Sequence, residues 1–444
     1  MKTLAALLLG KITQLSAKFL AWGAGGTWPG EIALTLNPNF NSQMIGQLKE
    51  GIVIVAGTNG KTTTSLMLTK IIEMQGKKVV HNATGANLIN GIASSFIQKS
   101  SWRGEIEADW GVFETDENSL PAVISNINSP NVGLIFSKKI VVILLNLFRD
   151  QLDRYGEVDV IAQKWEKALK SLPKETTIIA NADDPLIVYI ARRSKKHILY
   201  FGLNDKKEFL QKFEHATDSL FCPNCGSRLK YEGIYYSHIG IWYCNSCKEK
   251  RPTVNLSEWK SPLPGLYNRY NTLAAVLTAQ LFGFSKEEID STLTNFRPAF
   301  GRQEEFEING KKVLLFLSKN PAGFNQSLRT VIEMKAKQIL MVLNDRIPDG
   351  KDVSWIWDVD FENILEERKI IVSGDRMHDL ALRLKYCFRQ WNNETKEQLL
   401  IEKNLPLAIQ KSLEHTKVAE TLYILPTYSA MLEVRKILTG RKIL

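Results

Sequence analysis

Cysteine is scarce in this sequence, with five in 444 residues. That density is far too low for a fold held together by disulfides. Long apolar runs are missing too, since none reaches the roughly 18–20 residues of a membrane-spanning helix. The strongest candidate, residues 140–148 (IVVILLNLF), is better explained as a buried strand of a parallel sheet. Internal repeats and low-complexity segments are also absent, so compact domains are expected.

Charge of one sign is only moderately in excess. The chain has 57 Lys+Arg against 47 Asp+Glu, a formal net charge of +10, and 44% of its residues are hydrophobic. At ~100–200 residues per domain, two to four domains are expected. The positive balance suits a nucleic acid, an acidic membrane surface or a phosphorylated substrate, and it does not distinguish between them.

The N-terminus resembles a signal peptide only superficially. One lysine precedes an apolar run, but Gly10-Lys11 interrupts it. The apolar residues that follow, at 12, 15, 19 and 20, are spaced as in an amphipathic helix. We therefore expect an N-terminal helical arm over residues 1–45, which either docks on another domain or lies on a membrane surface.

A Gly-rich loop carries the clearest chemical signal. Residues 51–56 (GIVIVA) predict a strand, residues 65–76 predict a helix that stops at Gly76, and GTNGKTTT lies between them. This order is typical of a phosphate-binding loop, although the loop is shorter than GxxxxGK[ST]. We expect Lys61 to reach the β- and γ-phosphates and Thr62 to hold Mg²⁺. The other predicted phosphate contacts are Gly57, Thr58, Asn59, Gly60 and Thr63.

An acidic cluster follows the next apolar segment. Residues 109–113 lead into Glu114-Thr115-Asp116-Glu117. A carboxylate at this sheet edge would supply the hard oxygen ligand that Mg²⁺ prefers. We predict Glu114 for this role because it comes first after the strand. The alternative is an exposed acidic turn.

Four of the cysteines form the pattern CxxC-x18-CxxC, at Cys222, Cys225, Cys244 and Cys247. The residues between the two pairs predict a β-hairpin. This spacing is typical of a closed, structural zinc ribbon with four cysteine ligands, here placed at residues 215–253, and a redox dithiol pair is the alternative. Cys387 stands apart from any nucleophile motif, and we expect a buried thiol there.

The last third of the chain alternates strand and helix patterns. Strands are predicted at 313–317, 338–343, 369–374 and 421–426. Helices are predicted at 325–337, near 360–367, and at 376–387 and 428–439. Repeated strand–helix units imply a parallel, Rossmann-like sheet.

GTNGKTTT resembles the ATP loop of the Mur ligases and folylpolyglutamate synthetases. Other stretches follow in the same order as that family's motifs, at 146–156 (NLFRDQLDRYG), 181–185 (NADDP), 265–275 (GLYNRYNTLAA) and 301–304 (GRQE). The resemblance implies an α/β fold with a central Mur ligase-like ATP-binding domain over 46–298. The zinc ribbon would be inserted in this domain, and a C-terminal α/β domain would occupy 299–444.

The same resemblance implies further site residues. Asn268 and Asn271, three apart at a helix start, would both face the nucleotide. Arg302 would contact the γ-phosphate, and Lys319 the phosphate or acyl phosphate, unless Lys319 is only a solvated loop end. Gln151 replaces a histidine that is a metal ligand in the family. The resemblance therefore leaves open whether one or two Mg²⁺ ions bind.

Residues 349–362 (DGKDVSWIWDVDFE) are similar to the D-G-x-D-x-S-W-I-W-D signature of MurT C-terminal domains. With the inserted ribbon, this narrows the resemblance to the MurT family, the synthetase subunits of lipid II isoglutaminyl synthase. It implies ATP-dependent activation of the α-carboxylate of D-glutamate in the lipid II stem peptide. Ammonia would then convert the acyl phosphate to D-isoglutamine.

The resemblance also implies a partner. The chain has no credible glutaminase nucleophile, so a GatD-type class I glutamine amidotransferase subunit would supply ammonia within a heterodimer. Asp352 would complete the partner's Cys–His pair, with Asp349 and Asp358 as competitors. The implied cofactors are ATP, Mg²⁺ and structural Zn²⁺, and the implied location is cytoplasmic, peripheral at the inner face of the membrane.

Two other functions compete with this one. An amino-acid-adding ligase of the Mur or folylpolyglutamate type is disfavoured by the ribbon and the residue 349–362 stretch. An NTP-dependent nucleic-acid-binding protein would need a recognition motif or an aromatic-interleaved basic run, and the sequence has neither.

Overall fold

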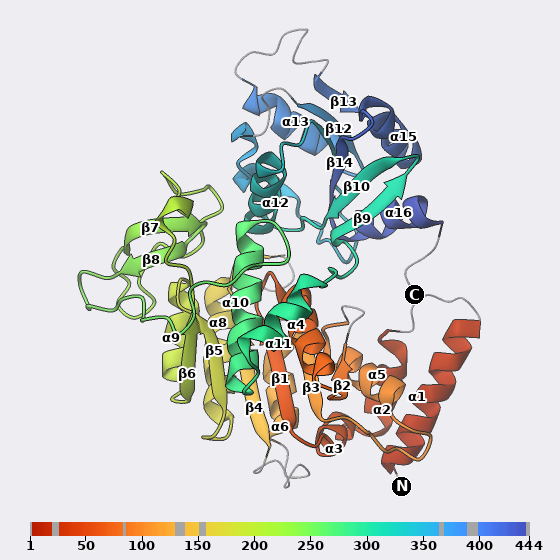
Figure 1. Ribbon diagram of the computed structural model, residues 1–444, viewed down its shortest axis with the longest axis vertical. Coiled ribbons are helices and arrows are strands. Elements are labelled where there is room, and N and C mark those ends of the chain that lie inside the picture. The colour runs from red at the N-terminus through yellow and green to blue at the C-terminus, as the bar shows by residue number, and fades with distance from the viewer. Residues whose placement is uncertain are drawn as a thin grey trace.

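The computed structural model describes residues 2–19, 26–82, 86–128, 138–150, 157–363, 368–388 and 398–440. It contains two six-stranded sheets and a small two-stranded sheet. The two large sheets lie one above the other along the long axis, and the small sheet projects from one side (Figure 1). In these residue ranges, no helix is long and apolar enough to cross a membrane.

The first helices form the N-terminal arm. They are α1 (Lys2–Phe19), α2 (Trp28–Leu36) and α3 (Phe40–Ile45). All three pack on α5 (Ile89–Lys99), which belongs to the first large sheet's helical layer. The arm is therefore attached to one edge of that layer.

The first large sheet is entirely parallel, in the order β2-β3-β1-β4-β5-β6. Its strands are β1 (Gly51–Ala56), β2 (Val79–His81), β3 (Trp110–Thr115), β4 (Lys139–Leu144), β5 (Thr177–Asn181) and β6 (His197–Phe201). The apolar run expected to form a buried strand is β4, which ends at Leu144. Because both faces of β1 and β4 are buried, helices must cover the sheet on both sides.

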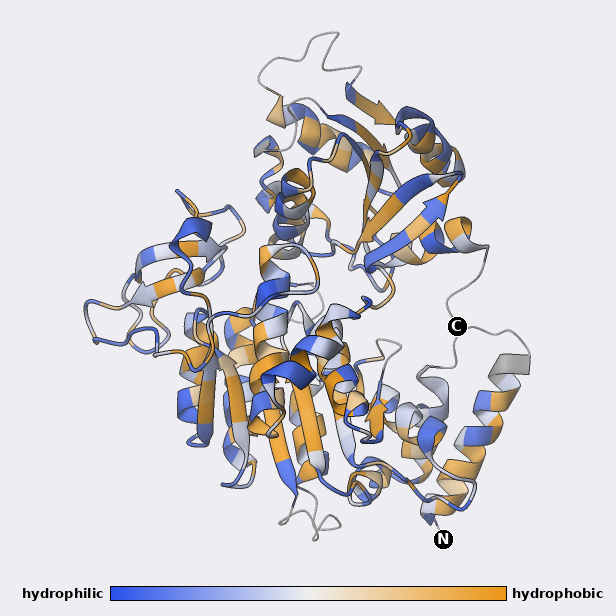
Figure 2. Ribbon diagram, viewed as in Figure 1, coloured by the Kyte–Doolittle hydropathy of each residue, from blue (hydrophilic) through white to orange (hydrophobic). Residues whose placement is uncertain are grey.

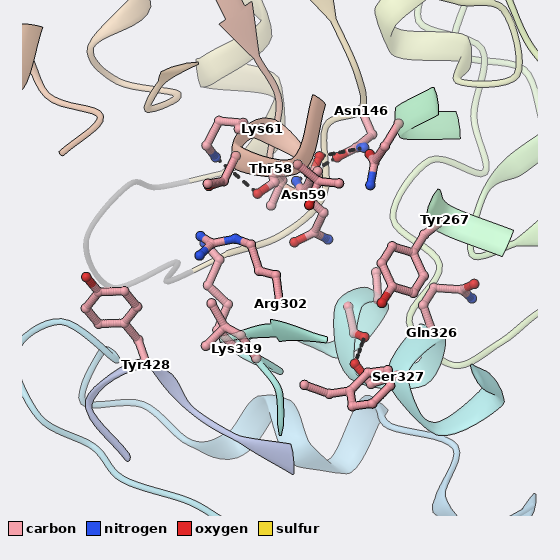
Figure 3. A pocket seen from close by; sticks show the side chains of 18 of the residues that line it. Thr58, Asn59, Lys61, Asn146, Tyr267, Arg302, Lys319, Gln326, Ser327 and Tyr428 are labelled. Carbon is pink, nitrogen blue, oxygen red and sulfur yellow. Dashed lines mark hydrogen bonds between the residues drawn. The ribbon is translucent and has the colours of Figure 1, made fainter. Parts of the chain in front are cut away.

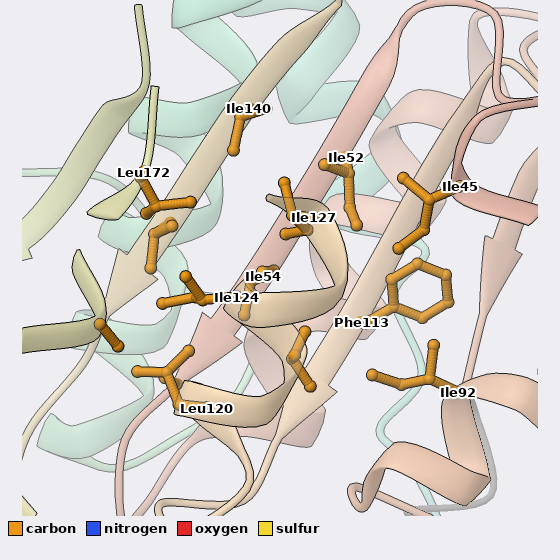
Figure 4. Packing of buried hydrophobic residues seen from close by; sticks show 14 of the residues in the cluster. Ile45, Ile52, Ile54, Ile92, Phe113, Leu120, Ile124, Ile127, Ile140 and Leu172 are labelled. Atoms are coloured by element: carbon orange, nitrogen blue, oxygen red, sulfur yellow. The ribbon is translucent and has the colours of Figure 1, made fainter. Parts of the chain in front are cut away.

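One face is covered by α5, α6 (Leu120–Ile127), α8 (Val158–Ser171) and α9 (Pro185–Arg193). Figure 4 shows part of this core, where α6 side chains pack on Ile54 and Ile140 of the sheet. The opposite face is covered by α4 (Lys61–Met74), α10 (Leu266–Leu281) and α11 (Lys286–Thr294). The three-layer arrangement places the loop before α4 at the carboxyl edge of the sheet.

The ribbon hairpin consists of β7 (Lys230–Tyr236) and β8 (Ile239–Tyr243), which are antiparallel as predicted. It lies between β6 and α10 in the chain, after the short turn η3 (Lys206–Glu208). Trp242 fixes it to the first large sheet, because its Nε1 donates to the Ala182 carbonyl at 3.0 Å. The cysteine segment is thus an insertion in the domain built on the first large sheet.

The C-terminal sheet has the order β13-β12-β11-β14-β10-β9. Its strands are β9 (Arg302–Ile308), β10 (Lys311–Phe316), β11 (Gln338–Val342), β12 (Lys369–Ser373), β13 (Leu399–Ile401) and β14 (Thr421–Pro426). The predicted parallel sheet is wrong for β9, which is antiparallel to β10. Asn309 and Gly310 join them with φ of 51° and 71°, and so short a turn permits only antiparallel pairing.

The C-terminal helices are α12 (Pro321–Glu333), α13 (Met377–Cys387), α15 (Leu405–His415) and α16 (Tyr428–Thr439). α12 begins before the predicted residue 325, because the Asn320 side chain caps it at the Gly323 N–H. The helix predicted near 360–367 is a short 3-10 turn, η5 (Phe361–Asn363), and its later residues lie outside the described ranges. Another 3-10 turn, η4 (Ser354–Asp358), precedes it.

Candidate functional site

A cavity of about 310 Å³ lies where the first large sheet, α10 and the C-terminal sheet meet. Its walls combine stretches that are far apart in the sequence, and Figure 3 shows several of their side chains around one space. The sequence-predicted residues that line it are Thr58, Asn59, Gly60, Lys61, Thr62, Thr63, Asn268, Asn271, Arg302 and Lys319.

The phosphate loop is held tightly against its neighbours. Gly60 has φ of 91°, and a Cβ there would lie 2.1 Å from Asn271 Oδ1. Both its backbone conformation and this close approach therefore require glycine. Asn146, two residues beyond the end of β4, fixes the loop, since its side chain accepts from the Asn59 N–H at 2.9 Å and donates to the Asn59 carbonyl at 3.1 Å. Sequence reasoning gave Asn146 no role, although it opens the NLFRD stretch.

Lys61 begins α4 and is buried at the cavity wall. Its Nζ donates to the Thr58 carbonyl at 3.1 Å and lies 3.3 Å from Glu117 Oε2. Burial alone would raise the pKa of Glu117, but Lys61 and Lys319 outweigh burial and hold this pKa below its usual value. Glu117 is therefore an anionic partner of Lys61, a role that sequence reasoning missed.

Thr62 and Glu114 meet as predicted, with Thr62 Oγ1 donating to Glu114 Oε2 at 2.6 Å. The expectation that Glu114 follows the strand is wrong, because β3 continues to Thr115 and Glu114 pairs in register with Val55 of β1. Neighbouring ligands of an octahedral Mg²⁺ lie about 2.9 Å apart. The two oxygens are close to this spacing, so the donor pair fits a magnesium ion.

Lys319 enters the cavity from the C-terminal sheet and forms an ion pair with Asp150. Burial lowers the pKa of Lys319, but the Asp150 and Glu117 carboxylates outweigh it and raise this pKa above its usual value. The ammonium is therefore charged near neutral pH. Lys319 is thus a half-buried member of a charge network with the buried Asp150 and Glu117, rather than a solvated loop end.

The neighbour of Lys319 also contacts the phosphate loop. Asn320 Nδ2 donates to Asn59 Oδ1 at 3.0 Å, and Asn59 Nδ2 donates to Asn320 Oδ1 at 3.3 Å. Asn320 also caps α12. The C-terminal sheet is therefore aligned with the phosphate loop by a reciprocal amide pair.

The two predicted asparagines of α10 lie together. Asn271 Nδ2 donates to Asn268 Oδ1 at 3.0 Å, and Asn268 Nδ2 donates to the Pro264 carbonyl at 2.7 Å. Arg302, the first residue of β9, lines the same cavity and donates to the Phe300 carbonyl at 3.3 Å. The structure therefore places these three predicted residues in one wall.

Sequence reasoning missed other lining residues, among them Tyr267, Gln326 and Tyr428 (Figure 3). Gln326 is buried, yet in the described part of the chain neither end of its amide has a hydrogen-bond partner. Buried amides are normally satisfied, so Gln326 is suited to bind a ligand in the cavity. No local motif marks it, because its position depends on how α12 meets α10.

The four ribbon cysteines converge on one point, with all Sγ atoms within 4.8 Å of one another. The distances are 3.5 Å for Cys222–Cys247 and 3.5 Å for Cys225–Cys244. A tetrahedral zinc site with bonds of about 2.3 Å places its sulfurs about 3.8 Å apart. The cluster therefore fits a closed Zn²⁺ site better than two separate redox pairs.

The three candidate aspartates differ in their surroundings. Asp352 is exposed, and the Ser354 N–H donates to it at 2.8 Å and lowers its pKa. Asp349 is buried and accepts from the Ser429 N–H at 2.8 Å, and Asp358 lies 3.2 Å from Arg149. Asp352 is thus the member most open to a partner protein. Gln151 lies outside the described residues.

Two family models match this chain. One describes the Mur ligase middle domain and matches residues 55–279, and the other describes the MurT ligase C-terminal domain and matches residues 317–431. The chain is also similar to a pseudomurein peptide ligase type C from Methanothermus fervidus, with a TM-score of 0.63 and 21% identity over 88% of this chain and 79% of that one. This structural likeness supports the fold.

Curated relatives cover nearly the whole length. The chain is 33% identical to the lipid II isoglutaminyl synthase subunit MurT of Streptococcus pneumoniae, over 100% of this chain and 98% of that protein. It is 31% identical to the subunit of the same name from Staphylococcus aureus, over 94% of this chain and 93% of that protein. With the fold and the cavity described above, these similarities show that the chain belongs to the MurT family of Mur ligases.

Proposed function

We propose that this chain is the synthetase subunit of a glutamine-hydrolysing lipid II isoglutaminyl synthase and acts in peptidoglycan biosynthesis. The observation that best supports this proposal is the cavity lined by both the phosphate loop and Lys319. The chain is also similar to MurT subunits over nearly its full length. The reaction is carbon–nitrogen ligation at the α-carboxylate of D-glutamate in the stem peptide.

In the first step, an oxygen of the substrate carboxylate attacks the γ-phosphorus of ATP. A carboxylate O–P bond forms, the β–γ phosphoanhydride bond breaks, and ADP leaves. The loop amides of residues 57–63 bind the phosphates, while Lys61 and Arg302 stabilise charge on the transferred phosphoryl group. Asn268 and Asn271 contact the nucleotide. Mg²⁺, held by Thr62 and Glu114, would neutralise phosphate charge.

In the second step, ammonia attacks the acyl phosphate carbon. The C–N bond forms, the C–O bond to phosphate breaks, and a proton of the attacking ammonia passes to the phosphate. Inorganic phosphate leaves, and the stem peptide now carries D-isoglutamine. Lys319 stabilises the leaving phosphate, and its ion pair with Asp150 holds it in place. The Asn59–Asn320 pair keeps Lys319 aligned with the phosphate loop.

We propose that ammonia comes from a GatD-type glutaminase in a heterodimer with this chain. Burial raises the pKa of the Cys387 thiol to about 12, so this cysteine is a poor nucleophile near neutral pH. Asp352 orients the partner's histidine, in keeping with its exposure. The ribbon cysteines hold structural Zn²⁺.

The chain divides into an arm at 1–45, an ATP-binding domain at 46–298 with the ribbon at 215–253, and a C-terminal domain at 299–444. It works in the cytoplasm at the inner face of the membrane, where lipid II is available.

The experiment is mass spectrometry of lipid II incubated with ATP, glutamine, this chain and the glutaminase partner. Amidation makes the product lighter by the difference between OH and NH₂, and an ammonium salt should replace glutamine and the partner. Lys61→Ala should abolish the product, while Lys70→Ala, an exposed lysine of the same helix, should not. Addition of an amino acid would favour the Mur or folylpolyglutamate type of ligase instead. Absence of ATP turnover would contradict both functions.

A further inference from the structure

Helix α1 buries only one of its apolar faces. Ala6 and Leu7 are buried, and Gly10 lies so close to α5 that a Cβ there would come within 2.6 Å of the Ile97 side chain. This inner face packs on α2 and α5. The inner face alone therefore holds α1 on the rest of the protein, and the residues on the other side of α1 take no part in this packing.

The outer face of α1 is also apolar. Leu4, Leu9, Ile12 and Leu15 are 41%, 45%, 52% and 55% exposed. Their helical spacing places them on one side of α1, together with the half-buried Leu8. Single exposed aliphatic residues are common, but a continuous group of them on one helix marks an interaction surface. We call these five residues the outer face.

α1 lies at the margin of the molecule, on the side opposite the ribbon (Figure 1). Figure 2 shows hydrophobic residues along its length, with hydrophilic bands between them. The outer face is thus presented at an edge of the protein where a large flat partner could reach it.

The charge of α1 is of one sign. The helix has lysines at positions 2, 11 and 18 and no acidic residue, and of these Lys2 is exposed while Lys11 is buried and donates to the Ser100 carbonyl at 2.7 Å. Trp102 borders the outer face, since its ring centroid lies 5.4 Å from Lys11 Nζ. Trp102 is 56% exposed. Aliphatic residues, an exposed lysine and an exposed tryptophan form a combination that binds the surface of an anionic bilayer.

The outer face is linked to the cavity through α5. This helix packs on α1, and the residues that precede and open it, Asn87 and Leu88, line the cavity. One helix therefore connects the element that carries the outer face with the edge of the cavity.

We propose that the outer face of α1 docks this protein on an anionic lipid bilayer. The inference rests on the proposed function only for the identity of the membrane-anchored substrate. The exposed Lys2 and the net charge of +10 favour an anionic bilayer over a second copy of this basic chain, because two copies of like charge repel each other. The test also distinguishes a bilayer from two other occupants of the outer face, the glutaminase partner and a second copy of this chain.

The test is flotation of the full chain with vesicles, alone and in complex with the glutaminase. We expect binding to vesicles that contain phosphatidylglycerol and much weaker binding to pure phosphatidylcholine. Ile12→Gln/Leu15→Gln should reduce the bound fraction at least about tenfold. The matched control, Leu407→Gln/Val418→Gln, removes exposed aliphatic residues of the C-terminal region and should bind like the wild type.

Three results would overturn the proposal: no flotation of the wild type, equal flotation of both double variants, or loss of the partner or of a self-associated state in Ile12→Gln/Leu15→Gln. Thermal unfolding checks the fold of the variants, and the single change Leu9→Gln decides the question if the double variant is unfolded. Amidation of a stem peptide without its lipid should be unaffected by these changes. If this reaction is absent in the wild type while flotation persists, the proposed function fails and the docking surface stands.

Discussion

Asn59 of the phosphate loop and Asn320 of the C-terminal region exchange two amide hydrogen bonds, at 3.0 and 3.3 Å. These residues are 261 positions apart. Because Lys319 precedes Asn320, this pair fixes the distance between the phosphate loop and the lysine that we assign to the acyl phosphate. The phosphate loop and the C-terminal region are therefore aligned by residues at the site.

Replacing Asn320 by alanine should lower the amidation kcat about tenfold, since each such hydrogen bond contributes on the order of 1 kcal/mol. Asn404→Ala is the matched control, because Asn404 caps α15 in the same way but lies outside the cavity. Steady-state amidation kinetics with ammonium salt would measure both variants. Equal losses in the two would mean that only helix capping matters.

Replacing Glu117 by glutamine should weaken ATP turnover, because the change removes the carboxylate that holds Lys61 in the phosphate loop. We expect a loss on the order of tenfold or more in kcat/KM for ATP. Glu166→Gln removes a surface carboxylate that pairs with Lys170 and Arg193, and it should leave turnover unchanged. Unaltered kinetics in Glu117→Gln would contradict the assigned pairing.

Asp352→Asn should abolish glutamine-dependent amidation while leaving ammonium-dependent amidation intact. The reason is that the aspartate acts on the partner's histidine and not on the acyl phosphate. Asp379→Asn, a change in α13, serves as control. Glutaminase turnover of the complex is the measurement, and undiminished turnover would transfer the role to Asp349 or Asp358.

Each chain should contain one tightly bound zinc ion, measurable by metal analysis of the purified protein. Cys247→Ser should lose the metal and expose residues 215–253 to proteolysis, because the ribbon hairpin depends on the cluster. Cys387→Ser should keep both metal and protease resistance, since Cys387 lies outside the cluster. Zinc retained at full occupancy in Cys247→Ser would contradict a four-thiolate site.

Glu214 predicts a specific pH dependence of stability. Burial raises its pKa to about 7, against an ordinary value of 4.5. Between these values the unfolded chain releases a proton that the folded chain keeps, so Glu214 lowers the free energy of unfolding as pH rises, by up to about 3 kcal/mol. Glu214→Gln keeps an acceptor for the Ser237 N–H and should flatten the dependence between pH 5 and 7 in denaturant unfolding. Glu105→Gln, at an exposed position, is the control. If Glu214→Gln and the wild type showed the same change of unfolding free energy with pH, the raised pKa of Glu214 would be contradicted.

The sequence predicted the parts of the site that local pattern controls. Lys61 and Thr62 follow from the strand–loop–helix order, and the cysteine cluster from its spacing. Glu117 and Gln326 could not be found in this way, because their roles arise from contacts with residues far along the chain. The β9–β10 hairpin is different, since Asn309-Gly310 is a local turn signal from which the antiparallel pairing can be predicted.

The central claim is that the substrate carboxylate is activated as an acyl phosphate in the cavity between the phosphate loop and Lys319. The most direct measurement uses lipid II labelled with ¹⁸O in the α-carboxylate of D-glutamate, together with ATP and ammonium. The account predicts that one labelled oxygen appears in the released inorganic phosphate, because the C–O bond breaks when ammonia attacks. Amidated product accompanied by unlabelled phosphate would contradict it.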